Sequence, residues 1–172
     1  MRDLIRGMVC LVVLVSIAAS PAWAGNHRIG GGLHYWRATD DIDVEGIDED
    51  GWVYVLSYQY RPFPLVAAEF DLEISDPGYG GADGRVYAPQ AYVLVGLGLY
   101  AGLGVGTYFH DGEFDDLFYA ARGGVSFPLL LPVVLLDLHV DYRFTEWKGL
   151  SSLADEVSTD VITVGAQVRV SF

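Results

Sequence analysis

Apolar and polar residues alternate with a period of two through most of the chain after residue 24. The last thirteen residues, DVITVGAQVRVSF, show this clearly, because every second residue counted back from Phe172 is apolar. Successive side chains of a β-strand point to opposite faces, so this period predicts strands with one apolar face. Eight such strands are expected, at residues 27–38, 51–61, 65–75, 85–95, 99–110, 116–127, 133–146 and 160–172.

The lengths of the strands and of their connections predict how the strands are arranged. Each strand is close to the roughly 9–11 residues that a tilted strand needs to cross a bilayer. Short connections (RPFP, GLG and PLLLP) alternate with longer acidic ones (TDDIDVEGIDED, SDPGYGGADG, DGEFD and WKGLSSLADEVST). This rhythm predicts an all-β fold, an eight-stranded closed antiparallel up-and-down transmembrane β-barrel with its short turns at one end.

Residues 1–24 are expected to be a cleaved secretory signal peptide, which leaves residues 25–172 as the barrel domain. Arg2 and Arg6 precede the apolar segment MVCLVVLVSIAA, which is too short for a transmembrane helix. Ala22 and Ala24 then form the small-x-small pattern of a signal-peptidase site. The single cysteine, Cys10, lies in this segment, so no disulfide is expected in the barrel domain.

The charge of the chain argues against one class of partner. Its 23 acidic residues and 10 Lys and Arg residues give a net charge of −13. Binding to nucleic-acid phosphates requires clustered Lys and Arg, so no nucleic-acid partner is expected. High acidity can also indicate disorder, but 52% of the residues are hydrophobic, and a folded domain is expected.

The residue types on the apolar face predict that this face is the outside of the barrel. Within 51–61 this face is aromatic at both ends and aliphatic in the middle. Two aromatic bands around an aliphatic belt are typical of a membrane-embedded surface. The band at the long-loop end is expected to contain Tyr35, Trp52, Tyr87, Phe109, Tyr119 and Tyr142, and the other band Tyr60, Phe63, Phe127 and Phe172.

The opposite face carries charged residues that are expected to point into the lumen. An Arg or Lys on the lipid side costs about 2–4 kcal/mol near the midplane of the bilayer. The interior of an eight-stranded barrel is just wide enough for side chains to fill, and buried charges need partners. Five acids and five arginines are expected to neutralise one another there. The predicted lumen charge network consists of Arg28, His34, Arg61, Glu69, Asp71, Glu73, Arg122, Asp137, His139, Asp141, Arg143 and Arg169.

The signal peptide, the eight strands, and the segments YRPFP, GLGLYAGLGVGTYF and VRVSF resemble the small outer-membrane β-barrels of Gram-negative bacteria (OmpA/OmpX/OmpW-like, "porin family"). The resemblance covers essentially the whole chain after residue 24. It implies a monomer in the bacterial outer membrane, in contact with outer-membrane lipids and lipopolysaccharide. It also implies insertion by the barrel-assembly machinery, which would recognise the last strand through Ala166, Val168, Val170 and Phe172.

No catalytic residue, metal ligand or cofactor is expected. The segment GLGLYAGLGVG lacks the spacing of a dinucleotide-binding loop. His139 between Asp137 and Asp141 could support acid–base chemistry, but no motif places a serine beside it. The acidic residues of the first long connection offer oxygen ligands for Ca²⁺, but their spacing does not match an EF-hand. A solvated acidic loop is expected there.

These observations predict an integral outer-membrane protein that is not an enzyme and has a structural or surface-interaction role. Three alternatives remain open. One is a narrow channel or transporter for small or hydrophobic solutes, and another is an outer-membrane lipid-modifying enzyme. The third is a soluble periplasmic barrel like a lipocalin, which has the same period of two but buries the apolar face.

Overall fold

The computed structural model describes residues 26–39, 50–77, 79, 82, 84–110, 112–129, 131–144 and 160–172. Within them no helix is long and apolar enough to cross a membrane. The eight strands are β1 (His27–Ala38), β2 (Asp50–Phe63), β3 (Val66–Ser75), β4 (Val86–Gly96), β5 (Leu99–His110), β6 (Glu113–Pro128), β7 (Val134–Phe144) and β8 (Val161–Ser171). All eight expected strands are therefore present. The expected signal peptide, with Ala22 and Ala24, and the acidic segment 40–49 lie outside the described residues.

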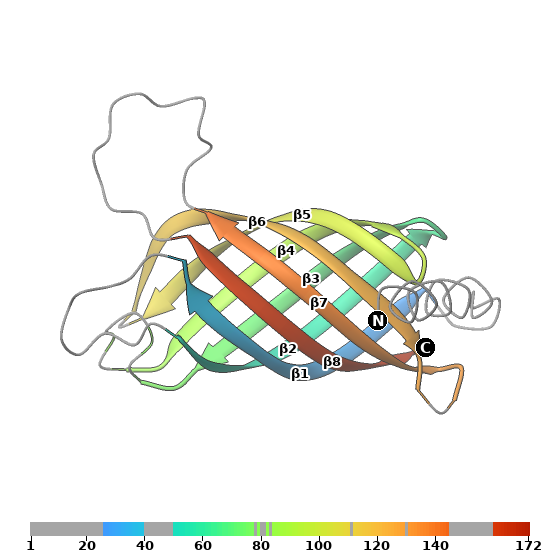
Figure 1. Ribbon diagram of the computed structural model, residues 1–172, viewed down its shortest axis with the longest axis horizontal. Helices are drawn as coiled ribbons and strands as arrows, with labels where there is room; N and C mark the ends of the chain where they lie inside the picture. The colour runs from blue at the N-terminus through green and yellow to red at the C-terminus, as the bar shows by residue number, and fades with distance from the viewer. Residues whose placement is uncertain are drawn as a thin grey trace, which may run out of the picture.

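The strands form one closed barrel, in which each strand pairs antiparallel with the next and β1 pairs with β8 (Figure 1). Closure leaves no unpaired sheet edge, which is the condition for a sheet to cross a bilayer. The short turns lie at the same end as the start of β1 and the end of β8. At the β4–β5 turn, Gly96 has a φ of 141°, and a Cβ there would lie 2.2 Å from the carbonyl oxygen of Leu99. This turn therefore requires glycine.

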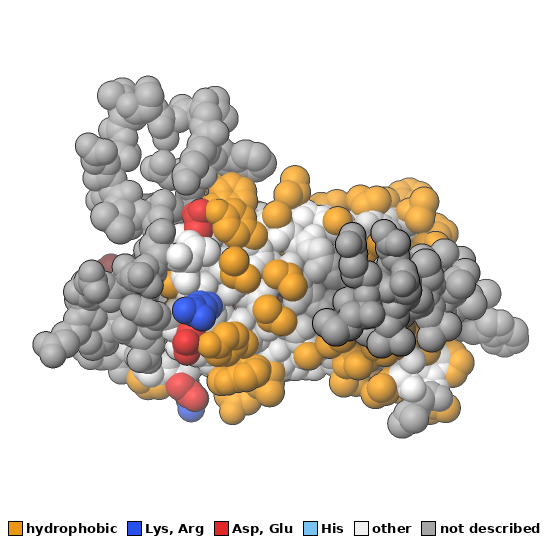
Figure 2. Space-filling model, viewed as in Figure 1, with side chains coloured by type: hydrophobic (Ala, Val, Ile, Leu, Met, Phe, Trp, Pro, Cys, Tyr) orange, Lys and Arg blue, Asp and Glu red, His pale blue; other side chains and the backbone are white. Residues whose placement is uncertain are grey.

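Alternate residues of the strands face outward and inward, as expected from the period of two. In β8, Val164 and Val168 are exposed, whereas Thr163 and Arg169 are fully buried. Figure 2 shows hydrophobic side chains along the flank of the barrel, with charged side chains beside its long-loop end. The apolar face is thus the outer face, which is the opposite of a lipocalin-like barrel.

Aromatic side chains pack against one another near both ends of the outer face. Near the long connections the ring centroids of Tyr35 and Trp52 are 5.2 Å apart. Near the short turns the ring of His27 stacks on Tyr60, with a centroid distance of 5.0 Å, and on Phe172, at 5.8 Å. Rings at the two ends of an aliphatic belt match the two headgroup regions of a bilayer.

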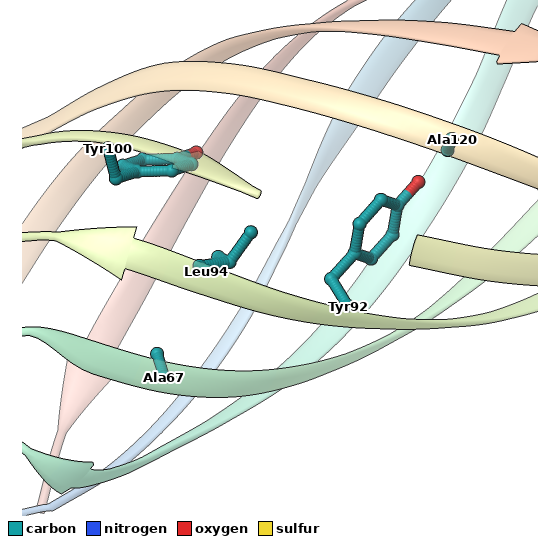
Figure 3. Close-up of a cluster of buried hydrophobic side chains, with 5 residues drawn as sticks. All are labelled: Ala67, Tyr92, Leu94, Tyr100 and Ala120. Carbon is teal, nitrogen blue, oxygen red and sulfur yellow. The ribbon is translucent and has the colours of Figure 1, made fainter. Parts of the chain in front are cut away.

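Strand β4 contributes an apolar part of the lumen. Pro89 points outward, while Tyr92 and Leu94, further along the strand, point inward. Tyr92, Leu94 and Tyr100 pack in the lumen with the small residues Ala67 and Ala120 (Figure 3). The interior therefore combines a charged network with an apolar wall made by strands β3 to β6.

Candidate functional site

The barrel interior contains nearly all the charged and histidine residues expected there. Eleven of the twelve are at most 3% exposed. The exception is Arg61, which is half-buried at the short-turn end, where its Nη2 donates to the carbonyl oxygens of Pro64 (2.9 Å) and Gly96 (2.5 Å). Arg28 donates to the side-chain oxygen of Gln59 at 3.0 Å. In the described part of the chain neither arginine forms an ion pair with a carboxylate: Arg61 donates to turn carbonyls and Arg28 to a side-chain amide.

Arg122 is the centre of the ion network. Its Nε and Nη2 donate to the two oxygens of Asp141 at 2.6 and 2.8 Å. Its Nη1 donates to Glu69 and to Asp71, each at 2.7 Å. The guanidinium carbon also lies 3.8 Å from the ring centroid of Tyr92. One cation therefore compensates three buried carboxylates through charge-assisted hydrogen bonds, which are stronger than neutral ones.

Arg169 and Arg143 extend the network towards the two ends of the barrel. Arg169 Nη2 donates to the same oxygen of Glu69 that Arg122 contacts, at 2.6 Å, and lies 3.5 Å from Asp137. Arg143 holds Glu73 with two hydrogen bonds, of 2.5 and 2.8 Å. The shared carboxylate of Glu69 joins Arg122 and Arg169 into one hydrogen-bonded unit, so the loss of one member affects its neighbours.

Two histidines meet in the middle of the lumen. His34 on β1 and His139 on β7 are both register partners of Gly165 on the intervening strand β8. Their Nε2 atoms are 3.0 Å apart, and the two rings are nearly perpendicular, with an interplanar angle of 83°. His34 Nδ1 is hydrogen-bonded to Glu73, and His139 Nδ1 to Asp137 at 2.9 Å. A carboxylate therefore fixes the orientation of each ring.

An aromatic layer covers the lumen at the long-loop end, and sequence reasoning missed it. The ring centroid of Tyr79 lies 4.6 Å from that of Trp36 and 5.7 Å from that of Tyr108. The Tyr108 ring lies 4.8 Å from Phe118. Burial raises the pKa of Tyr79 well above its usual value, so its hydroxyl remains a donor to Tyr108. Strand parity could have placed Trp36 and Phe118 inside, but Tyr79 comes from a connection without periodicity.

The four residues expected to form an assembly signal lie on the outer face. The side chains of Ala166, Val168, Val170 and Phe172 are all exposed. The backbone N–H of Phe172 donates to the carbonyl oxygen of His27 at 3.0 Å. Phe172 is therefore tied to the first strand, while its side chain remains accessible at the short-turn end.

Three features identify the class of protein: an apolar outer face, a sheet without edges and an ion-paired interior. They are the features of an eight-stranded transmembrane β-barrel with the fold of the small outer-membrane proteins. No protein-family model matches the chain, and no curated protein matches it.

Solved structures show the same fold. The chain is similar to Neisserial surface protein A, with 16% identity and a TM-score of 0.52, over 87% of this chain and 99% of that one. Weaker similarities are to OprG of Pseudomonas aeruginosa (15% identity, 87% and 97% covered, TM-score 0.49) and Ail of Yersinia pestis (20% identity, 84% and 99% covered, TM-score 0.44). The expected resemblance to small outer-membrane barrels is confirmed at the level of the fold.

Proposed function

We propose that this chain is an integral outer-membrane protein whose barrel is a non-conducting structural element. The observation that carries the proposal is a lumen occupied along its length by bonded side chains. Arg61 caps the short-turn end, the Arg122 cluster fills the middle, and the layer that includes Tyr79 covers the loop end. A permeant ion would have to separate buried, hydrogen-bonded charge pairs, which are costly to break one partner at a time.

We further propose that interactions with other molecules take place at the long-loop end. The acidic residues of the long connections carry much of the excess negative charge of the chain. Carboxylates are suitable ligands for hard divalent cations. Such cations would bridge the loops to the phosphate groups of lipopolysaccharide, while the outer face contacts lipid tails.

Planar-bilayer recording tests the non-conducting role. The purified barrel is reconstituted, and a porin of known conductance serves as the positive control in the same membrane. The wild-type barrel should give no steady single-channel steps. Reproducible steps of uniform size from the wild-type protein would instead support the narrow channel and would contradict the proposal.

A lipid-modifying role is tested separately, because His139 lies between Asp137 and Asp141 on one strand face, an arrangement that could support acid–base chemistry. In the structure both ring nitrogens of His139 face other lumen side chains. Lipid A from cells that express the wild-type protein or His139→Ala is compared by mass spectrometry with lipid A from cells without it. All three samples should be identical. A modification that needs the wild-type protein and disappears in the variant would overturn the non-enzymatic role.

A further inference from the structure

The histidine pair in the lumen has a geometry that two neutral imidazoles cannot satisfy. A carboxylate accepts the Nδ1–H of each ring, which leaves the lone pair on Nε2. The two Nε2 atoms nevertheless face each other at 3.0 Å. Two acceptors at this distance repel, and burial removes the water that would otherwise separate them. A cation between the two nitrogens would remove the repulsion.

We propose that His34 and His139 bind a zinc ion through their Nε2 atoms, with Asp141 as the third ligand. Two zinc–nitrogen bonds of about 2.0–2.1 Å at a tetrahedral angle place the nitrogens about 3.3 Å apart. The observed separation is 3.0 Å, and one ligand atom from each of the three residues lies within 4.8 Å of the others. Two imidazoles and one carboxylate are a donor set that zinc uses in proteins.

The partners of the two rings are those expected around metal-bound histidines. A ligating histidine usually donates its second ring N–H to a carboxylate, which orients the ring and increases its basicity. Glu73 and Asp137 have this position here. Asp137 is itself held by the hydroxyl of Tyr100 at 2.7 Å. The rings are therefore held in place before any ion binds.

Gly165 provides the space in which the two rings meet. It lies between them on β8, directly in register with both. A Cβ at this position would be 2.3 Å from Nε2 of His139 and 2.7 Å from Cδ2 of His34. A side chain here would push the rings apart, so the two histidines can approach each other only because this residue is glycine.

The charges and amides around the pair also favour a cation. Among the described residues, five buried carboxylates accompany four buried guanidiniums; they are Glu69, Asp71, Glu73, Asp137 and Asp141 against Arg28, Arg122, Arg143 and Arg169. The fifth lumen arginine, Arg61, is only half-buried and bonds to turn carbonyls at the short-turn end instead of to a carboxylate. The interior therefore has room for additional positive charge. The amide nitrogen of Gln167 lies 3.3 Å from His34 Nε2. Rotation of this amide by half a turn would present its oxygen as a fourth ligand, at the expense of the 3.4 Å contacts that this oxygen accepts from Arg169.

The test begins with the wild-type protein refolded into detergent micelles in the presence of Zn²⁺, because the closed lumen restricts later entry. Free metal is removed by gel filtration, and the zinc content of the folded fraction is measured by mass spectrometry. About one zinc ion per folded chain is expected. Refolding with Co²⁺ should give the intense visible absorption of a tetrahedral cobalt site with nitrogen ligands. A folded wild-type protein without bound metal and without this absorption would overturn the proposal.

Variants locate the site. His34→Gln and His139→Gln should each lower the affinity for zinc by at least about tenfold, and Asp137→Asn, which changes only the orienting carboxylate, by about 10–100-fold. His27→Gln is the matched control, since this half-buried histidine bonds to Tyr58 outside the lumen, and the zinc content of the variant should equal that of the wild type. Equal zinc retention in all the variants would overturn the assignment.

The competing explanation is a proton shared between the two nitrogens. It predicts a wild-type protein that folds without metal and shows one hydrogen-bonded Nε2 proton signal by NMR, unchanged by Zn²⁺ during refolding. This result would also overturn the proposal, and it does not depend on whether a histidine variant folds. Conductance measurements do not depend on this outcome. The proposal of a metal site and the proposal of a non-conducting role can therefore be contradicted independently of each other.

Discussion

Replacement of Arg122 by methionine tests whether the ion network holds the barrel together. Methionine retains the length of the side chain but removes the charge and all its donors. Three carboxylates would lose a partner, and Asp71 would lose the one that donates to its Oδ2. Because all four side chains are buried, water cannot replace the missing bonds.

The expected change in the free energy of unfolding is the balance of two opposing contributions. Arg122 donates four charge-assisted hydrogen bonds, each with a net contribution of about 1.5–3 kcal/mol. Against their sum stands the desolvation of the guanidinium, several kcal/mol, which the variant no longer bears. Removal of one partner of a buried ion pair typically costs about 3–5 kcal/mol. We expect Arg122→Met to lower the free energy of unfolding by an amount in this range.

Urea unfolding in phospholipid vesicles, followed by tryptophan fluorescence, measures this loss. A double-mutant cycle with Asp71→Asn isolates the interaction itself. In the Arg122→Met background, Asp71→Asn removes an unpaired charge, so the double variant should be more stable than the sum of the single effects by about 1–3 kcal/mol. Salt should have little influence on these values, because buried pairs are weakly screened.

The control is Arg85→Met, at an exposed arginine whose Nε lies 3.9 Å from Asp76. An exposed pair contributes about 0–1 kcal/mol, so this variant should unfold near the wild-type midpoint. The reasoning would be refuted if Arg122→Met were no less stable than Arg85→Met. Strict additivity in the Asp71 cycle would also refute it, because the two side chains would then not be coupled.

Three further changes test other parts of the structure. Gly165→Ala should lower the free energy of unfolding by about 1–3 kcal/mol in the same assay, because the added Cβ would overlap the histidine pair. Gly123→Ala is the control, since nothing lies within 4 Å of its added Cβ, and its free energy of unfolding should be close to that of the wild type. Leu138→Arg, on the lipid side near the middle of β7, should lower the free energy of unfolding by about 2–4 kcal/mol, and Phe63→Arg at the short-turn edge by about 0–1 kcal/mol. Equal losses would contradict the expected positions of these two residues in the bilayer. Deletion of Phe172, 65% exposed, should reduce the amount of protein in the outer-membrane fraction, as measured by immunoblot, while stability after refolding changes little; normal levels would contradict an assembly role for this residue.

The sequence could predict the strands and their faces because burial and lipid contact both impose a period of two. The sequence could not predict the position of each lumen residue along the barrel axis, and therefore which lumen residues contact each other. Register shifts occur between Tyr60 and Phe63 in β2, and between Thr107 and Phe109 in β5. Each shift displaces later residues along the barrel by an amount that alternation does not encode. Alternation could therefore assign these residues to one face of the strands, but it could not predict which of them contact each other.

The roles of individual lumen residues depend on their distance from the barrel ends. Arg28 and Arg61 have the same charge and face as Arg122, so the sequence treats them alike. In the structure Arg61 reaches turn carbonyls at the short-turn end, whereas Arg122 lies where only carboxylates can satisfy it. Tyr79, from a connection, covers the opposite end. End effects of this kind depend on three-dimensional closure, and period-two patterns contain no information about them.

The histidine pair lies at the seam that closes the barrel. His34 belongs to the first strand, and His139 and Gly165 to the last two, so the pair forms only when β1 and β8 meet. This pairing joins the two ends of the sheet, and its loop-closure entropy is the largest of the eight pairings. Glu73 and Asp137, which orient the rings, come from β3 and β7. An ion bound by both histidines would therefore favour the closed barrel over any partly paired state, since no open sheet presents both ligands together.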